Sequence, residues 1–271
     1  MRDGSMLLMS CALAGVLATH GARAQDRLVS PFEDYFRLTA GLLSASSQTE
    51  MRLDADDGTP GTVVSGEDDL GLREKGEMGD VELEIRIRER HRLRFNYFRV
   101  DRSGSQIIDR QIEFGNDTFD AGDLVESQLD WREFSITYGY TFLRRERYEI
   151  YGTFGLHLAE VLAAGEVSAD DIREEESGTF PIPALGAGTL VRVNDRFHIE
   201  ARVDYLSVGY QDIEGELLDL RGSVLYRFNR NLALGAAYVF TKREATSEDV
   251  GDSGFFDLRH DGPELFLRIT F

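Results

Sequence analysis

Cysteine, lysine and long apolar runs are scarce in this sequence. Cys11 is the only cysteine, and it lies in a leader segment, so a mature chain without that leader has none. Disulfides, thiolate nucleophiles and cysteine-ligated metals are therefore excluded. Beyond residue 24 no apolar stretch approaches the roughly 20 residues that a membrane-spanning helix needs. If the mature chain crosses a membrane, it does so as strands.

The first 24 residues have the layout of a secretory signal peptide. Residues 6–18 form an apolar run that is too short to span a bilayer as a helix. Ala22 and Ala24 supply the small residues of a cleavage site, which predicts export and a mature chain of residues 25–271. A lipoprotein signal ending at Cys11 is the alternative, but it would leave only a short apolar run before the cysteine. Because no linker-like stretch divides the mature chain, we expect one domain.

Basic residues are few as well. The chain has 30 Lys and Arg residues against 49 Asp and Glu residues, a formal charge of −19, which excludes nucleic acid as a partner. Lys75 and Lys242 are the only lysines, so arginine supplies almost every positive charge. Acidic clusters occur at 54–58, 66–69, 169–176 and 247–254. They lack the ligand order of an EF-hand, so we expect no cofactor beyond weak Ca²⁺ or Mg²⁺ binding at these acidic loops.

Apolar and polar residues alternate along most of the mature chain, which is the period of a β-strand rather than a helix. In 80–98, for example, Val81 and Leu83 flank Glu82, and the apolar phase slips after Tyr97, which suggests a β-bulge there. The predicted strands lie in 35–53, 80–98 (two strands around a turn), 126–142, 147–162, 180–193, 197–210, 216–228, 231–242 and 257–271. The pattern therefore predicts ten strands.

The connections between these strands alternate in length. Tight turns are predicted near 89–91, 143–146, 194–196 and 229–231. Longer connections are predicted at about 54–77, 103–124, 163–179 and 243–256, with a shorter one at 211–215. Short turns at one end and long loops at the other are typical of an all-β, antiparallel, up-and-down transmembrane β-barrel, with eight strands as the alternative count. All five prolines avoid the centres of the predicted strands, as a fully paired ladder requires.

The two faces of the predicted strands suit such a barrel. Apolar rows would face lipid and charged rows would fill the lumen, where balanced Arg/Glu pairs are tolerated but unpaired charges are costly. The predicted lumen network comprises Glu82, Glu84, Arg86, Arg88, Arg94, Glu149, His157, His198, Glu200, Arg202, Asp204, Asp219, Arg221, Glu264 and Arg268. The two histidines could ligate a metal with nearby carboxylates, but we expect them as hydrogen-bonded members of this network and predict no metal site.

The chain ends in LFLRITF, which resembles the C-terminal strand of bacterial outer-membrane β-barrel proteins, and residues 180–208 and 226–240 are similar to the small porin-like members of that superfamily. The resemblance implies insertion by the barrel assembly machinery. The signal it would read is Leu265, Leu267, Ile269 and Phe271. We expect a monomer in contact with outer-membrane lipid and lipopolysaccharide. The expected role is structural, or that of a narrow and largely filled pore.

Two other functions remain open from the sequence. One is a hydrolase at the barrel rim acting on lipid A or peptides, for which His260 and the adjacent Asp261 are the best catalytic candidates because a histidine beside a carboxylate can act as a general base. The other is a soluble periplasmic barrel that binds a small apolar ligand. That function would require the apolar rows to face inward.

Overall fold

A computed structural model of the chain describes residues 30–167, 172–210, 213–248 and 253–271. The predicted signal peptide, 1–24 with its cleavage residues Ala22 and Ala24, lies outside the described residues. None of the described helices is long and apolar enough to span a membrane.

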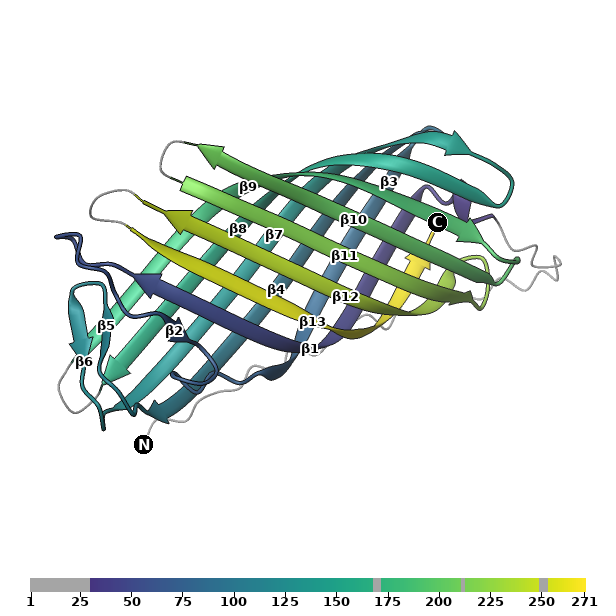
Figure 1. Cartoon of the computed structure of the whole chain (residues 1–271). Coiled ribbons are helices and arrows are strands. Elements are labelled where there is room, and N and C mark those ends of the chain that lie inside the picture. The colour runs from purple at the N-terminus through teal and green to yellow at the C-terminus, as the bar shows by residue number, and fades with distance from the viewer. Residues whose placement is uncertain (1–29, 168–171, 211–212, 249–252) are drawn as a thin grey trace.

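Ten antiparallel strands form the wall of a closed barrel (Figure 1). They are β1 (Phe36–Leu53), β3 (Lys75–Ile87), β4 (His91–Ile107), β7 (Leu124–Arg144), β8 (Tyr148–Val167), β9 (Ile172–Arg192), β10 (Phe197–Tyr210), β11 (Ile213–Arg227), β12 (Leu232–Ser247) and β13 (Gly254–Thr270). Each strand pairs with its neighbour in the chain, and β13 pairs with β1 from Arg37↔Thr270 to Leu53↔Gly254. The predicted ten-stranded up-and-down barrel is therefore confirmed, and the eight-stranded alternative is wrong.

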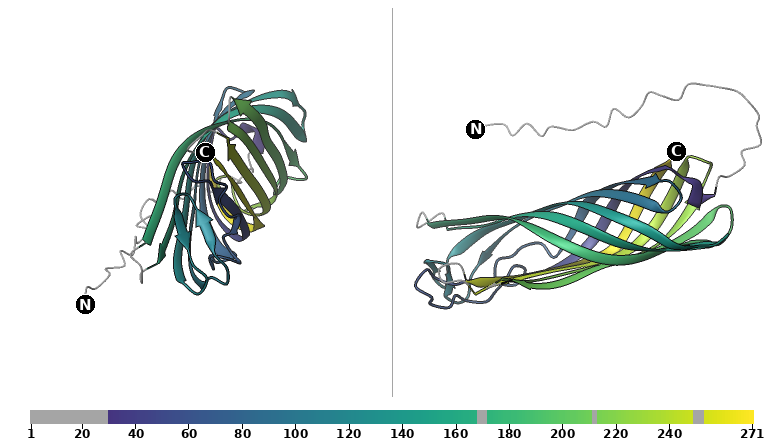
Figure 2. Two further views of the ribbon diagram at one scale, coloured as in Figure 1. Left: turned by 60° about the vertical axis from the view of Figure 1, so that its left-hand side comes forward. Right: turned by 90° about the horizontal axis from the view of Figure 1, so that it is seen from above.

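The two ends of the barrel differ, as the alternating loop lengths predicted. The turns at 88–90, 145–147, 193–196 and 228–231 lie at the end that also holds the C-terminus, which we call the turn end (Figure 2). The opposite, loop end carries three short strands, β2 (Val64–Ser65), β5 (Ile112–Phe114) and β6 (Asp117–Phe119). β2 pairs with β1, and β5 and β6 form a separate hairpin.

The strands reach further toward the loop end than the sequence suggested. The predicted loop 163–179 is wrong, because β8 continues to Val167 and β9 begins at Ile172. Three prolines lie near strand centres, against the expectation that prolines avoid them: Pro181 and Pro183 in β9, and Pro263 in β13, where the pairs with β1 skip residues 262 and 263. The described β9–β10 pairs run only from 192 to 185 on β9, so Pro181 and Pro183 fall beyond that ladder. Proline has no N–H to donate, so a strand tolerates it where one side is unpaired.

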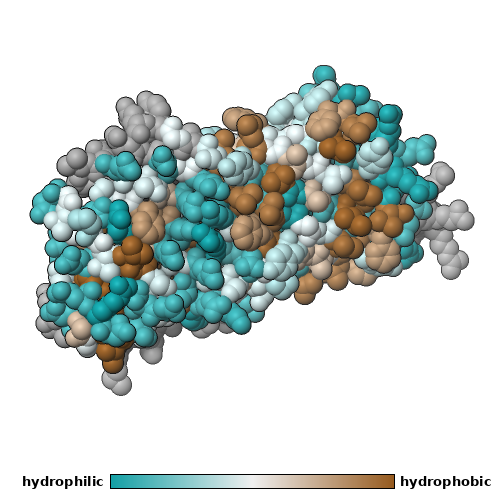
Figure 3. All heavy atoms as spheres, in the orientation of Figure 1, coloured by the Kyte–Doolittle hydropathy of each residue, from teal (hydrophilic) through white to brown (hydrophobic). Residues whose placement is uncertain are grey.

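Outward side chains of the turn-end half form an apolar belt. Its members include Phe36, Leu38, Leu42, Val81, Tyr97, Phe134, Ile136, Tyr138, Tyr140, Phe142, Phe154, Leu156, Leu158, Leu185, Phe197, Ile199, Tyr205, Leu220, Val224, Leu234, Tyr238, Leu265 and Leu267, all of them exposed. In Figure 3 apolar residues gather over the half nearest the turn end. The apolar rows thus face away from the lumen, which contradicts the soluble barrel with inward apolar rows in this half of the molecule.

The polarity of the wall reverses in the loop-end half. On β7, the belt residue Phe134 points outward, but nearer the loop end the apolar side chains of Trp131 and Leu129 point inward and are buried. The inner apolar cluster at this level consists of Leu43, Ala45, Met78, Val100, Trp131, Ala159 and Leu258. The same reversal explains the phase slip after Tyr97, where Val100 points inward; the β4–β7 register is continuous, so the predicted bulge is wrong. A register shift occurs instead between Thr141 and Leu143.

A second apolar cluster lies nearer the loop end. This cap cluster comprises Met51, Val64, Ile108, Ile112, Phe119 and Val125, and so joins the wall to β2 and the β5–β6 hairpin. Burial of these side chains holds the loop segments against the barrel, because each buried apolar side chain contributes roughly 1.5–3 kcal/mol.

Candidate functional site: the barrel lumen

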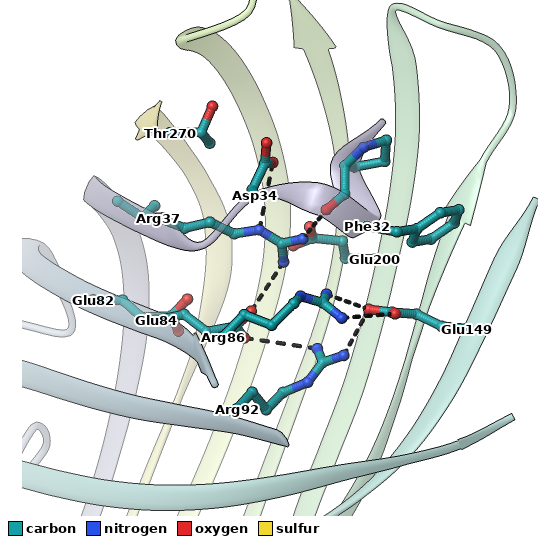
Figure 4. A network of polar contacts seen from close by, with 12 residues as sticks. Phe32, Asp34, Arg37, Glu82, Glu84, Arg86, Arg92, Glu149, Glu200 and Thr270 are labelled. Carbon is teal, nitrogen blue, oxygen red and sulfur yellow. Dashed lines mark hydrogen bonds and ion pairs between the residues drawn. The ribbon is translucent and has the colours of Figure 1, made fainter. Parts of the chain in front are cut away.

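Charged side chains from opposite walls meet inside the turn-end half of the barrel (Figure 4). Arg86 places Nη2 2.8 Å from Glu149 Oε1 and Nη1 3.1 Å from Glu149 Oε2. Arg92 Nη2 lies 2.6 Å from the same Oε1, and its guanidinium carbon stands 3.7 Å from the ring centre of Tyr151. Glu84 lies between Arg37 at 3.1 Å and Arg92 at 3.7 Å. Each carboxylate is thus shared by two guanidinium groups.

The segment before β1 closes this end of the lumen. Pro31 to Glu33 form a 3₁₀ turn, η1, whose Pro31 and Phe32 are buried. Arg37 donates to the carbonyl of Pro31, and Arg144 donates to the carbonyl of Phe32 at 3.1 Å. Asp34, also buried, accepts a hydrogen bond from Arg227 on β11. Three arginines of the wall therefore bind the entering chain across the mouth of the barrel.

Further pairs cross the middle of the lumen. Arg268 holds Glu200 with two hydrogen bonds of 2.5 and 3.0 Å and donates to Thr39 at 3.0 Å. Arg94 binds Asp204 at 2.9 Å. Arg202 pairs with Glu82, and Arg221 pairs with Glu264. These partners are up to 120 residues apart in the chain, so the pairs tie together strands that are not neighbours in the sheet.

A histidine and two carboxylates meet near the level where the lumen becomes apolar. His157 Nδ1 lies 2.7 Å from Glu133 Oε1, and with Asp219 they form the one cluster among the described residues whose spacing could hold a metal ion. Arg243 already binds both carboxylates, at 2.9 and 3.1 Å to Glu133 and 2.8 and 3.0 Å to Asp219. A guanidinium in that position supplies the positive charge a metal would bring, so the arrangement fits an ion-pair network better than a metal site.

Most of the predicted lumen residues lie inside the barrel. The sequence does not predict which of them pair with one another. Arg88 does not lie in the lumen as predicted. It lies in the turn between β3 and β4, is exposed, and has φ of 61°. β3 ends at Ile87, so the alternation that predicts an inward side chain at Arg88 does not extend to that residue. His198 is inside and buried, but its Nε2 has no hydrogen-bond partner among the residues that the structure describes.

Six network members were absent from the prediction: Asp34, Arg37, Arg92, Glu133, Arg227 and Arg243. The alternation of β1 would have placed Arg37 inward, and that of β7 would have done so for Glu133. The predicted strand 231–242 stops one residue short of Arg243, whereas β12 continues to Ser247. Asp34 lies before the first strand and carries no periodic signal.

The proposed catalytic pair at the rim does not form. His260 is buried inside the barrel, where its ring stacks on Phe98 with centroids 5.0 Å apart. Asp261 points outward and accepts a hydrogen bond from the hydroxyl of Tyr238, a residue of the apolar belt. Adjacent residues of a strand face opposite sides of the sheet, so the two side chains are separated by the wall.

Little space remains between the lumen side chains. The larger cavity, about 80 Å³, lies among residues that include Asp204, Asp219 and His260, and a smaller one of about 20 Å³ lies beside Arg37 and Tyr151. Spaces of this size hold a few water molecules but no drug-sized ligand.

The acidic loops, where they are described, are engaged within the protein. Asp54 accepts hydrogen bonds from the N–H of Gly61 and the hydroxyl of Ser253 and pairs with Arg52 at 2.8 Å. Burial raises the pKa of the Asp54 carboxyl, but these donors lower it by more, so its pKa lies below the ordinary value. Glu67 is bound by Arg102. Parts of the predicted clusters 169–176 and 247–254 lie outside the described residues.

Comparisons with known proteins agree with this architecture. The outer membrane protease OmpT from Escherichia coli superposes with a TM-score of 0.55 and 10% identity over 91% of this chain and 100% of that one. This chain has the fold of a bacterial outer-membrane β-barrel. At such low identity the likeness extends to the barrel fold alone.

Two further solved structures are matched by the barrel at lower similarity. Ail of Yersinia pestis, in complex with the heparin analogue sucrose octasulfate, has a TM-score of 0.38 and 12% identity over 85% of this chain and 98% of that one. The toluene transporter TodX of P. putida has a TM-score of 0.33 and 10% identity over 90% of this chain and 93% of that one. These scores add nothing to the fold assignment. No family model matches the chain, and no curated protein matches it.

Proposed function

We propose that the protein is a non-conducting scaffold of the bacterial outer membrane, with the turn end in the periplasm and the loop end outside the cell. The observation that supports this most is the content of the lumen. Paired arginines and carboxylates occupy the turn-end half, the segment around Phe32 lies across the mouth, and the inner apolar cluster fills the level above. A solute would have to displace all three layers.

The membrane location is supported by the apolar belt and by barrel closure. A spanning sheet in hydrocarbon must leave no edge, because each unpaired backbone group costs several kcal/mol. The end of β13 completes the ring: Phe271 N donates to Phe36 O at 3.0 Å, and Tyr35 N donates to Phe271 O at 2.9 Å. We expect the barrel assembly machinery to recognise this terminal strand, in which Leu265, Leu267 and Phe271 are exposed on the outer face. Export would use the predicted signal peptide.

Two measurements test this function. Purified protein in planar lipid bilayers should show no steady conductance, and membrane fractions should contain a band that migrates differently when boiled and unboiled. Steady single-channel conductance of the unmodified protein would establish a pore instead. A soluble protein without heat-modifiable migration would refute the membrane location.

A further inference from the structure

The barrel wall has an opening between β3 and β4 just above the apolar belt. The two strands pair from Ile87↔His91 to Gly79↔Arg99, and no described pair continues the ladder beyond that point. The strands then diverge around a hollow of about 370 Å³. Nearer the loop end the wall closes again, where Gly104 packs directly on the carbonyl of Gly71; a Cβ on Gly104 would lie 2.0 Å from that oxygen.

The edges of this hollow are fixed by hydrogen bonds. Ser47 N donates to the carbonyl of Glu74 at 2.7 Å, which attaches the loop before β3 to β1. Arg102 Nε donates to the carbonyl of Arg73 at 3.0 Å, which attaches the same loop to β4, and the other end of Arg102 is bound to Glu67. The hollow is therefore formed before any ligand arrives, which lowers the entropic cost of binding.

Two positive charges at the hollow are free to bind an anion. Arg73 and Lys75 both line it, are exposed, and have no ion-pair partner among the residues that the structure describes. The other lysine, Lys242, is by contrast paired with Glu244 at 2.7 Å and with Glu216 at 3.8 Å. Of the other charged residues at the hollow, Arg102 is bound to Glu67 and Asp101 is paired with Arg99 at 2.8 Å.

A buried hydroxyl also faces this space. Ser47 is 1% exposed and lines the hollow, and its Oγ has no hydrogen-bond partner among the described residues. A buried hydroxyl without a partner is unfavourable, so its presence indicates a ligand or water that completes it. Glu77, also at the hollow, offers an acceptor for ligand hydroxyls.

The hollow lies at the height of the lipid headgroups. The last β3–β4 pair below it, Gly79↔Arg99, is two residues beyond Val81 and Tyr97, which are the last exposed apolar side chains of the belt on β3 and β4. Phosphate oxygens prefer charge-assisted hydrogen bonds from Arg and Lys, and sugar hydroxyls need neutral donors and acceptors. We propose that this hollow binds a phosphorylated sugar, namely the headgroup of a lipopolysaccharide molecule of the surrounding outer leaflet. The lipid source depends on the membrane location proposed above; the sugar-phosphate chemistry does not.

A large side chain at Gly76 would fill the hollow and so test the proposal. A Cβ at Gly76 meets nothing within 4 Å, and the same is true at Gly79, which does not line the hollow. Gly76→Phe should therefore block the site, and Gly79→Phe is its matched control. Arg73→Glu and Lys75→Glu remove the anion-binding charges, with Lys242→Glu as the control. Ser47→Ala removes the hydroxyl without breaking a hydrogen bond within the described protein.

Binding is measured with two probes, in detergent and in vesicles. Glucosamine 6-phosphate is titrated into the protein while the emission of Trp131, the only tryptophan, is followed; Trp131 pairs with Val100, which lines the hollow. Retention of lipopolysaccharide is measured after reconstitution into phosphatidylcholine vesicles with and without lipopolysaccharide. Heat-modifiable migration verifies that each variant is folded.

We expect Arg73→Glu, Lys75→Glu and Gly76→Phe each to weaken both interactions about tenfold or more, because a charge-assisted hydrogen bond contributes about 1.5–3 kcal/mol. Gly79→Phe and Lys242→Glu should stay within about twofold of the unmodified protein, since neither position lines the hollow and hot-spot effects are local. If the sugar phosphate binds but lipopolysaccharide retention is unaffected by all variants, the lipid source is refuted. If inorganic phosphate binds as tightly, sugar recognition is refuted. If binding is unchanged in the Arg73, Lys75 and Gly76 variants, the proposed site is refuted. The conductance test of the scaffold function is independent of all these outcomes.

Discussion

Replacing Glu149 by Gln should destabilise the barrel far more than replacing a surface carboxylate. Glu149 is completely buried and accepts hydrogen bonds from Arg86 at 2.8 and 3.1 Å and from Arg92 at 2.6 Å. Without that charge, the remaining contact of Arg86 among the described residues is a long one of 3.4 Å to the carbonyl of Glu89. Arg92 keeps the hydroxyl of Thr141 at 3.0 Å and Glu84 at 3.7 Å. Removing one partner from a buried ion pair typically costs about 3–5 kcal/mol, so we expect a loss of that size.

The surface comparison is Glu160→Gln. Glu160 lies 3.9 Å from Arg132, and the two side chains are 59% and 43% exposed. An exposed pair of this kind contributes about 0–1 kcal/mol. Urea unfolding in phospholipid vesicles, followed by the mobility difference between folded and unfolded protein, gives the free energy of unfolding of each variant.

A charge-balanced double variant separates lost attraction from leftover charge. Arg86→Met with Glu149→Leu removes one cation together with the anion, and should recover most of the stability lost in Glu149→Gln, because buried ion pairs can often be replaced by apolar residues at little cost. If Glu149→Gln and Glu160→Gln lower the free energy of unfolding by similarly small amounts, water in the lumen screens the charges around Glu149. The conclusion that the lumen is closed to water there would then be refuted.

Three further predictions concern other parts of the chain. Phe271→Ala should slow insertion by purified barrel assembly machinery while leaving the stability of the assembled barrel nearly unchanged; equal insertion rates would remove the terminal signal. Pro181→Val with Pro183→Val restores two N–H donors to β9 and should slow amide exchange in residues 206–209 of β10, measured by mass spectrometry, whereas unchanged exchange would mean that the prolines do not cause the ladder to end. Because the pKa of Asp54 is lowered in the folded state, its stabilising effect is present above its unfolded pKa of about 3.9 and is lost as the pH falls through its folded value; Asp54→Asn should therefore lower the urea midpoint at neutral pH and flatten its decline in acid.

The wall of the barrel was predictable because lipid imposes one rule on every strand. Outward residues such as Phe134 and Leu156 must be apolar, and a two-residue period therefore survives in the sequence. The rule ends where the belt ends. Beyond Tyr97 the inner face becomes the apolar one, so a correct alternation looked like a bulge, and strands that continue in water were mistaken for loops.

The partners within the lumen were much harder to predict. Strand alternation assigns Glu149 and Arg86 to the inside, but not to each other, since opposing partners depend on the tilt and stagger of the closed barrel. The residues around Phe32 precede the first strand and show no period, so their place across the mouth had no signal. The separation of His260 from Asp261 was available from alternation alone, because neighbours in a strand face opposite sides.

At the proposed location in the outer membrane, the reversal of polarity along each strand would fix how deep the barrel sits in the bilayer. Moving it inward by one alternation step would bring Arg99, Arg132 and Asp261 toward the hydrocarbon, and a lipid-facing arginine costs about 2–4 kcal/mol at the midplane and less near the interface. Moving it outward by the same step would bring the loop-side edge of the apolar belt, including Val81 and Tyr97, into water. The protein therefore has a single preferred immersion depth, and a bilayer of different thickness must deform around it.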